Sequence, residues 1–158
     1  MNIHTGKITE FKTINYVNNK YVISWGLEQI NDDTYRWKYF IMNTKPSVDE
    51  IKATIETYIN DNTKHIIETG FYWNNMNIYL SLENQIDYKL LFDITMIKEG
   101  YNLPEKLKFK INGEKIYYNI DTIDEFKDFI IAMNNHIRTC LDKGNNLKDS
   151  INYEEYKI

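Results

Sequence analysis

The segment GFYWNNMNIYLSLENQ, residues 70–85, joins an aromatic strand to a polar helix start through one tight turn. Asn74-Asn75 tolerates the positive φ angles that a two-residue hairpin turn requires. Gly70 suits a position where a side chain would block a close backbone approach. Alternation along the strand places Phe71 and Trp73 on one face. The segment therefore predicts a β-hairpin with an aromatic buried face.

The same segment predicts a helix that begins at Ser81. Serine is a preferred N-cap residue, and the Gln85 amide can satisfy a nearby backbone group. Apolar residues recur at helical spacing beyond it, at Ile86, Leu90, Ile94 and Ile97. We expect Ile86 and Leu90 to fold back over the hairpin, which makes residues 70–91 a structural nucleus of the domain.

The chain before this nucleus predicts a β-meander followed by a helix. Strand-like runs occupy residues 12–17, 21–25 and 35–42, with short polar turns between them. Ser47 and Glu50 then form an S-x-x-E capping box directly after Pro46, which predicts a helix that reaches about residue 60.

The chain after the nucleus predicts one more hairpin and a long helix. The strands of the hairpin flank Asn112-Gly113, a strong turn signal, and Leu103-Pro104 precedes them. Thr122 and Glu125 form the capping box of the last helix, and Gly144 is its expected C-terminal stop.

Hairpins, rather than crossovers, connect neighbouring strands, which predicts an α+β fold with an antiparallel meander and hairpins packed against three α-helices. Residues 1–43 are expected to form the meander, as a separate small lobe or an interaction segment. Residues 44–152 would form the main α+β domain, and residues 153–158 a polar tail.

The composition excludes several functional classes. The net charge of −4 argues against a nucleic-acid binder, which normally carries a basic patch. Cys140 is the single cysteine of the sequence, so no intramolecular disulfide is expected, and the sequence lacks an apolar run that could span a membrane. The sequence shows no signal peptide, which predicts synthesis in the cytoplasm.

No residue pattern predicts catalysis, a metal site or a cofactor site. His4, His65 and His136 lack metal-ligand spacing, and none is expected beside Cys140. The acidic pairs at 32–33, 124–125 and 154–155 are typical of a turn, a first helical turn and a charged tail. Lys106, Lys108 and Lys110 alternate with apolar residues, a pattern typical of a protected edge strand.

Aromatic residues are abundant, at 15% of the sequence, and they supply the candidate binding sites. Two interpretations remain open for the meander. Its rings form the core face of the sheet, or they form a patch that docks a partner protein or a sugar ring. The candidate interface residues are Trp25, Tyr35, Trp37, Tyr39, Tyr153 and Tyr156.

Four segments carry a resemblance to a known family: RWKYFIMNTKPSVDEIKATIETYIN, IIETGFYWNNMNIYLSLENQ, LPEKLKFKI and IRTCLDKGNNLKD. Their order resembles a domain of unknown function that recurs in virion proteins of tailed bacteriophages, including crAss-like phages. The similarity covers residues 35–152. Its recognisable points are Pro46-Ser47, Gly70-Phe71 with Trp73, Ser81 with Glu83 and Gln85, Leu103-Pro104, and Lys148-Asp149 after Gly144. Asn145 stands where the family pattern has a tryptophan.

The resemblance implies a building block without catalytic activity. We expect a homo-oligomeric virion protein of the tail or head fibre, which is assembled into the particle after its synthesis in the host. Its partners would be other virion proteins. The alternative is a carbohydrate-binding module that recognises host glycans through exposed tryptophan and tyrosine rings.

Overall fold

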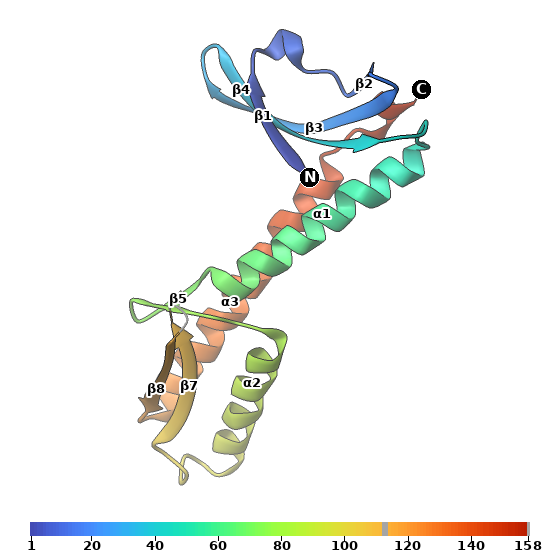
Figure 1. Ribbon diagram of the computed structural model, residues 1–158. Coiled ribbons are helices and arrows are strands. Elements are labelled where there is room, and N and C mark those ends of the chain that lie inside the picture. The colour runs from blue at the N-terminus through green and yellow to red at the C-terminus, as the bar shows by residue number, and fades with distance from the viewer. Residues whose placement is uncertain (112–113, 158) are drawn as a thin grey trace. The chain divides into compact units, whose positions relative to one another are not determined.

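The computed structural model describes residues 1–111 and 114–157 (Figure 1). Asn112 and Gly113 of the predicted hairpin turn therefore lie outside the described residues. The elements follow in this order: β1 (Asn2–Gly6), η1 (Ile8–Glu10), β2 (Ile14–Val17), β3 (Lys20–Asn31), β4 (Thr34–Met42), α1 (Val48–Thr69), β5 (Phe71–Trp73), β6 (Met76–Ile78), α2 (Leu82–Ile97), β7 (Glu105–Ile111), β8 (Glu114–Ile120), α3 (Ile123–Asp149) and η2 (Tyr153–Tyr156). The antiparallel sheets and the α-helices of the described residues confirm the predicted α+β class.

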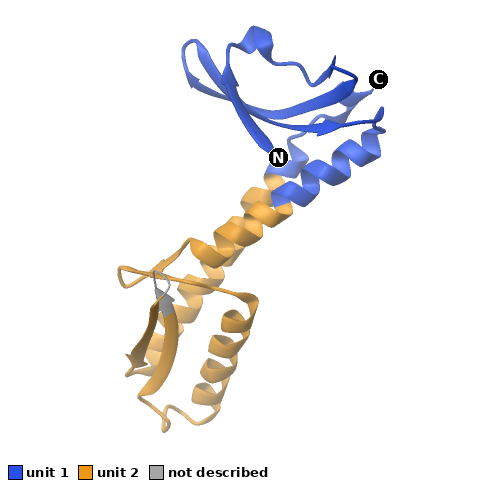
Figure 2. Cartoon of the chain, viewed as in Figure 1, with its two compact units in different colours: residues 1–59, 147–158 blue, residues 60–146 orange. Residues whose placement is uncertain are grey.

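The chain divides into two compact units (Figure 2). Unit 1 comprises residues 1–59 and 147–158, and unit 2 comprises residues 60–146. The division differs from the predicted domains, because its boundaries fall inside α1 and inside α3 rather than near residues 43 and 152. The meander thus shares its unit with the first part of α1 and with the C-terminal segment.

Unit 1 contains a four-stranded antiparallel sheet in the order β1-β4-β3-β2. Strands β2, β3 and β4 form the predicted meander. Strand β1 was not predicted, because its sequence NIHTG is short and lacks apolar alternation, and it pairs with β4 from Asn2↔Tyr39 to Gly6↔Tyr35. The core of the unit contains Ile23, Trp25, Phe40, Ile51, Ile55, Ile59 and Tyr156.

The C-terminal segment completes this core. Tyr156 in η2 is buried, and its hydroxyl donates a hydrogen bond of 2.9 Å to the carbonyl oxygen of Ser24 in β3. Thr13 also donates a hydrogen bond to the carbonyl oxygen of Glu155. The prediction of a polar tail at residues 153–158 is therefore wrong for Tyr156, whose ring is part of the hydrophobic core.

Helix α1 begins with the predicted capping box and ends later than predicted. The Ser47 hydroxyl accepts a hydrogen bond from the backbone N–H of Glu50 at 3.2 Å, and the Glu50 carboxylate accepts one from the backbone N–H of Ser47 at 2.8 Å. The Ser47 hydroxyl also donates a hydrogen bond of 2.9 Å to the Glu50 carboxylate, and the two hydrogen bonds that the carboxylate accepts from Ser47 lower the pKa of Glu50. The helix passes the polar residues near Asn60 and continues to Thr69, because Ile67 is buried one turn before Gly70.

Unit 2 is built around an aromatic core to which β5, β6, β7, β8, α2 and α3 contribute side chains. Phe129 of α3 lies at its centre, with ring centroids 5.0 Å from Trp73, 5.3 Å from Tyr88 and 5.5 Å from Phe109. The indole N–H of Trp73 donates a hydrogen bond of 2.9 Å to Asp128. The core residues are Phe71, Trp73, Ile78, Leu80, Tyr88, Leu107, Phe109, Ile120, Phe126, Phe129, Ile130 and Met133.

The β5–β6 hairpin confirms the predicted turn and the predicted faces. Asn74 and Asn75 have φ angles of 45° and 61°. Phe71 and Trp73 are buried, whereas Tyr72 points to solvent. A Cβ atom on Gly70 would lie 2.8 Å from the carbonyl oxygen of Ile66, so the close approach expected at this glycine is present.

Helix α2 begins at the predicted cap, but its buried face was predicted wrongly. The Ser81 hydroxyl accepts a hydrogen bond from the backbone N–H of Asn84, and the Gln85 amide donates one to the carbonyl oxygen of Leu80. The fully buried residues of the helix are Tyr88 and Thr95. Ile86 and Leu90, which were expected to cover the hairpin, are both exposed.

Helix α3 passes through Gly144, which was predicted to end it, and continues to Asp149. A Cβ atom at position 144 would lie 2.5 Å from the hydroxyl oxygen of Thr63 in α1. Gly144 therefore permits a close approach of two helices within unit 2. The cap at the other end is as predicted, since the Thr122 hydroxyl accepts a hydrogen bond from the backbone N–H of Glu125.

Alkaline pH is expected to destabilise unit 2 through Tyr88. Burial, with a smaller effect from the Asp87 carboxylate, raises the pKa of Tyr88 to about 12 from a usual value of 10.0. Between these two values the unfolded chain loses its proton before the folded protein does. The free energy of unfolding should therefore fall by up to about 1.4 kcal/mol per pH unit above pH 10.

The measurement is urea unfolding of the wild-type protein and of Tyr88→Phe from pH 8 to pH 12. The other tyrosines contribute equally to both proteins, so the wild-type curve should fall more steeply than that of the variant. Parallel curves would contradict the assignment.

Candidate interaction surfaces

The two tryptophans predicted to form a docking patch in unit 1 are buried. Trp25 is 2% exposed and Trp37 is 5% exposed. Trp25 lies in the core of unit 1, where its ring packs edge-on against Tyr58 at 5.7 Å and Lys38 lies over it at 5.1 Å. The prediction of exposed tryptophan platforms is therefore wrong, and of the two open interpretations the core face applies to Trp25.

Trp37 is covered on the other face of the sheet. The His4 ring lies 4.6 Å from the Trp37 ring, and Phe11 meets it edge-on at 5.7 Å. Segment 7–13, which contains η1, supplies Phe11 as part of this cover. The segment follows β1, the strand missed from the sequence, so nothing in the local pattern indicated that Trp37 would be covered.

The remaining candidate aromatics are partly exposed or buried. Tyr35 and Tyr39 on β4 are half-buried, as is Tyr153, whose ring lies beneath the Lys52 ammonium at 5.6 Å. Tyr156 is buried in the core. None of the six candidate interface residues therefore forms a fully exposed ring surface.

A pocket of about 190 Å³ lies beside Trp37 and includes Tyr39, His4 and Glu10. The His4 Nε2 atom lies 3.6 Å from a Glu10 carboxylate oxygen, and both side chains are half-exposed, so solvent screens this pair. The pocket is smaller than the about 300–1,000 Å³ of typical small-molecule sites. Its groups can form hydrogen bonds to a small polar molecule, but its volume does not fit a sugar chain.

A second pocket in unit 1, of about 400 Å³, lies between residues 25–27 of β3 and the C-terminal segment. Trp25 and Tyr156 line it, yet both are buried and offer almost no ring surface to a ligand. Phe11 also lines the pocket and is half-buried, so it is the one lining ring in this pocket that offers partial surface to a ligand.

The structure brings His136 and Cys140 together, which was not predicted. The Cys140 Sγ atom lies 3.8 Å from Nε2 and 4.0 Å from Nδ1 of His136, one helical turn away on α3. His136 Nε2 is 3.2 Å from the carbonyl oxygen of Ile67, which can only accept a hydrogen bond, so Nε2 carries the proton. Burial raises the pKa of the Cys140 thiol, against a smaller lowering effect of Lys143. A nucleophilic thiol requires the opposite shift.

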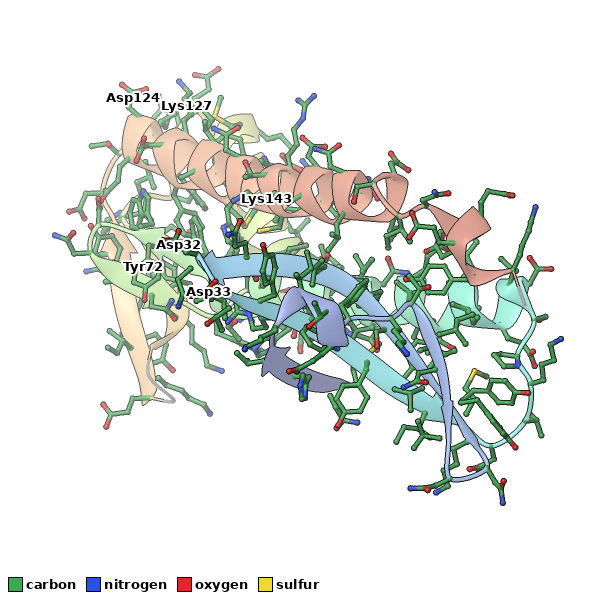
Figure 3. All side chains as sticks on the ribbon, turned by 90° about the horizontal axis from the view of Figure 1, so that it is seen from above. Asp32, Asp33, Tyr72, Asp124, Lys127 and Lys143 are labelled. Carbon is green, nitrogen blue, oxygen red and sulfur yellow. The ribbon has the colours of Figure 1, made fainter. Side chains whose placement is uncertain are left out.

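The other charged candidates lie on the surface as expected. Asp124, in the first turn of α3, is 3.2 Å from the Lys127 ammonium, and both side chains point away from the helix at the same end (Figure 3). Lys106 lies over the exposed Tyr117 ring at 4.6 Å, while Leu107 and Phe109 on the opposite face are buried. The Lys110 side chain lies outside the described part of the structure. Within that part, no group of three or more histidine, cysteine or acidic residues is arranged to hold a metal ion.

Helix α2 carries exposed apolar side chains along one side. Four large apolar side chains of this helix are well exposed, namely Leu82 (66%), Ile86 (57%), Leu90 (57%) and Ile97 (81%). We call these four residues the α2 stripe. The helical spacing of Ile86, Leu90 and Ile97 is visible in the sequence, but Leu82 was not part of that prediction, and Ile86 and Leu90 were expected to be buried. Tyr88, Leu91 and Phe92 form the apolar face that packs in the core instead.

No helix in the described residues is long and apolar enough to cross a membrane. Comparison of the chain with models of protein families, with curated proteins and with solved structures finds no match.

Proposed function

We propose that this protein is a structural component without catalytic activity, which connects or decorates parts of a larger assembly. The α2 stripe carries the proposal. Monomeric proteins rarely keep a row of large aliphatic side chains in water, and such patches usually mark protein–protein contacts. The stripe lies on a helix whose opposite face is fixed by Tyr88 and Thr95, so it is presented on a rigid support.

The setting that we propose is a tailed-bacteriophage particle, with the protein in the tail or head fibre and other virion proteins as its partners. The support is the resemblance of residues 35–152 to a domain of such proteins. Its recognisable residues Gly70, Ser81 and Gly144 have roles in backbone packing and capping, which suits a building block.

Carbohydrate binding is not proposed. A sugar ring stacks on an exposed aromatic face, whereas Trp25 and Trp37 are buried. A thiol-dependent hydrolase is not proposed either, because the environment of Cys140 favours the neutral thiol.

Quantitative mass spectrometry of purified particles of the virus that encodes the chain tests the proposal. We expect a constant ratio of this protein to the major capsid protein across the particle fractions of a density gradient. An abundant host cytoplasmic protein serves as the control and should decline to background in the same fractions. Absence from particles, or a ratio that varies between fractions, would overturn the virion assignment.

A further inference from the structure

We propose that the α2 stripe binds the α2 stripe of a second copy of this chain, with the two helices antiparallel. This inference rests on the proposed role in assembly and names the first partner. It is carried by the geometry of the stripe, by its area and by the distribution of charge beside it.

The stripe is straight, and both of its ends are aliphatic. At 3.6 residues per turn, Leu82, Ile86, Leu90 and Ile97 fall within about 80° of one another around the helix, over a length of about 22 Å. Leu82 and Ile97 lie near its two ends, and the other two residues lie between them. In an antiparallel pair centred between Leu82 and Ile97, Leu82 meets Ile97 of the partner subunit, and the two copies of Leu90 lie beside the two-fold axis that a closed dimer requires.

The apolar area suits a weak dimer. An aliphatic side chain of four carbons contributes about 130 Å² when fully exposed, so the four residues at their observed exposures present on the order of 300 Å² per copy. About 60% of the area of a protein interface is apolar. An apolar area of about 300 Å² per copy therefore corresponds to a total buried area of about 1,000 Å² when the polar rims of both copies are included. That total is at the lower limit for a specific interface, and repeated copies in an assembly would strengthen it by avidity.

The charges beside the stripe favour the antiparallel arrangement. Glu83 and Asp87 flank its N-terminal half, and Lys98 follows its C-terminal end on the same flank. In an antiparallel pair each flank meets itself in reverse order, so Glu83 lies near Lys98 of the partner subunit. The helix dipoles also oppose each other favourably in this arrangement.

Asp93 interrupts the stripe between Leu90 and Ile97, but its charge is compensated. The Lys89 ammonium lies 3.0 Å and 3.2 Å from the two Asp93 carboxylate oxygens. In the antiparallel pair Asp93 lies opposite Ile86 of the partner subunit, so the carboxylate enters the interface as an ion pair with Lys89 rather than as an isolated charge.

Sedimentation velocity of the full-length chain from 1 to 200 μM tests the dimer. We expect the mass to rise from 19.0 kDa towards twice that value, with a Kd in the micromolar range. Leu90→Glu places two carboxylates opposite each other at the two-fold axis and should raise the Kd at least tenfold. The matched control is Leu141→Glu, the same substitution at an exposed position of α3, which should leave the Kd unchanged.

A charge swap tests the arrangement. Glu83→Lys and Lys98→Glu should each weaken the dimer by two- to fivefold, and the double variant should restore it. A wild-type chain that stays monomeric at 200 μM, a dimer unaffected by Leu90→Glu, or a double variant weaker than either single one would overturn the inference. None of these results changes the particle measurement, so a monomer found at constant copy number in virions would leave the proposed function standing.

Discussion

Replacing Phe129 with alanine is expected to lower the free energy of unfolding of unit 2 by about 3–5 kcal/mol. Phe129 is fully buried, and its ring lies within 6 Å of four others: those of Phe71, Trp73, Tyr88 and Phe109. The truncation removes the apolar contacts of one ring and also leaves a cavity that four fixed neighbours cannot fill. The loss should therefore be near the upper end for a phenylalanine.

Hydrogen exchange resolved by peptide, at increasing urea concentration, measures this effect for each unit separately. Tyr72→Ala is the control, because Tyr72 is in the same hairpin as Phe71 and Trp73 but is 68% exposed, and it should cost less than about 1 kcal/mol. Peptides from residues 60–146 should lose protection in Phe129→Ala. A loss below that of the control would show that Phe129 is not central to the core.

Local signals in the sequence predicted the turns and the helix starts. The Asn74-Asn75 turn, the Ser47 capping box and the Ser81 cap each depend on contacts within four residues. The residues that form such contacts are neighbours in the sequence, so the local pattern is enough to predict them. The end of α3 shows the opposite case. Gly144 resembles a helix stop in sequence, but its role is set by Thr63, which is distant in the chain.

The exposure of the α2 stripe also depends on contacts with residues distant in the chain. The helical spacing of Ile86, Leu90 and Ile97 was visible in the sequence, but α2 has apolar residues on two sides, and periodicity alone cannot decide which side is buried. Tyr88 occupies the inner position because its hydroxyl reaches the carbonyl oxygen of Lys108 on β7 at 2.8 Å. That contact is a tertiary one, so the exposed stripe became apparent only in the folded protein.

Replacing Tyr156 with alanine is expected to lower the free energy of unfolding of unit 1 by about 3 kcal/mol or more. The ring belongs to the unit 1 core, and its hydroxyl donates a hydrogen bond to the Ser24 carbonyl oxygen across 132 positions of the sequence. Burial also raises the pKa of this tyrosine, so the hydroxyl remains a neutral donor well above neutral pH. Tyr156→Phe keeps the ring and removes the hydrogen bond, and it should cost about 1 kcal/mol.

Tyr153→Phe is the matched control for that smaller change. The Tyr153 hydroxyl is also buried, but it has no hydrogen-bond partner among the described residues, so its removal relieves a desolvation cost. The same chemical change three residues apart should therefore have opposite effects: Tyr156→Phe destabilises unit 1, and Tyr153→Phe leaves its stability unchanged or raises it. Urea unfolding combined with hydrogen exchange of residues 1–59 measures both. Equal losses in the two variants would mean that the Tyr156–Ser24 hydrogen bond does not hold the C-terminal segment on the sheet.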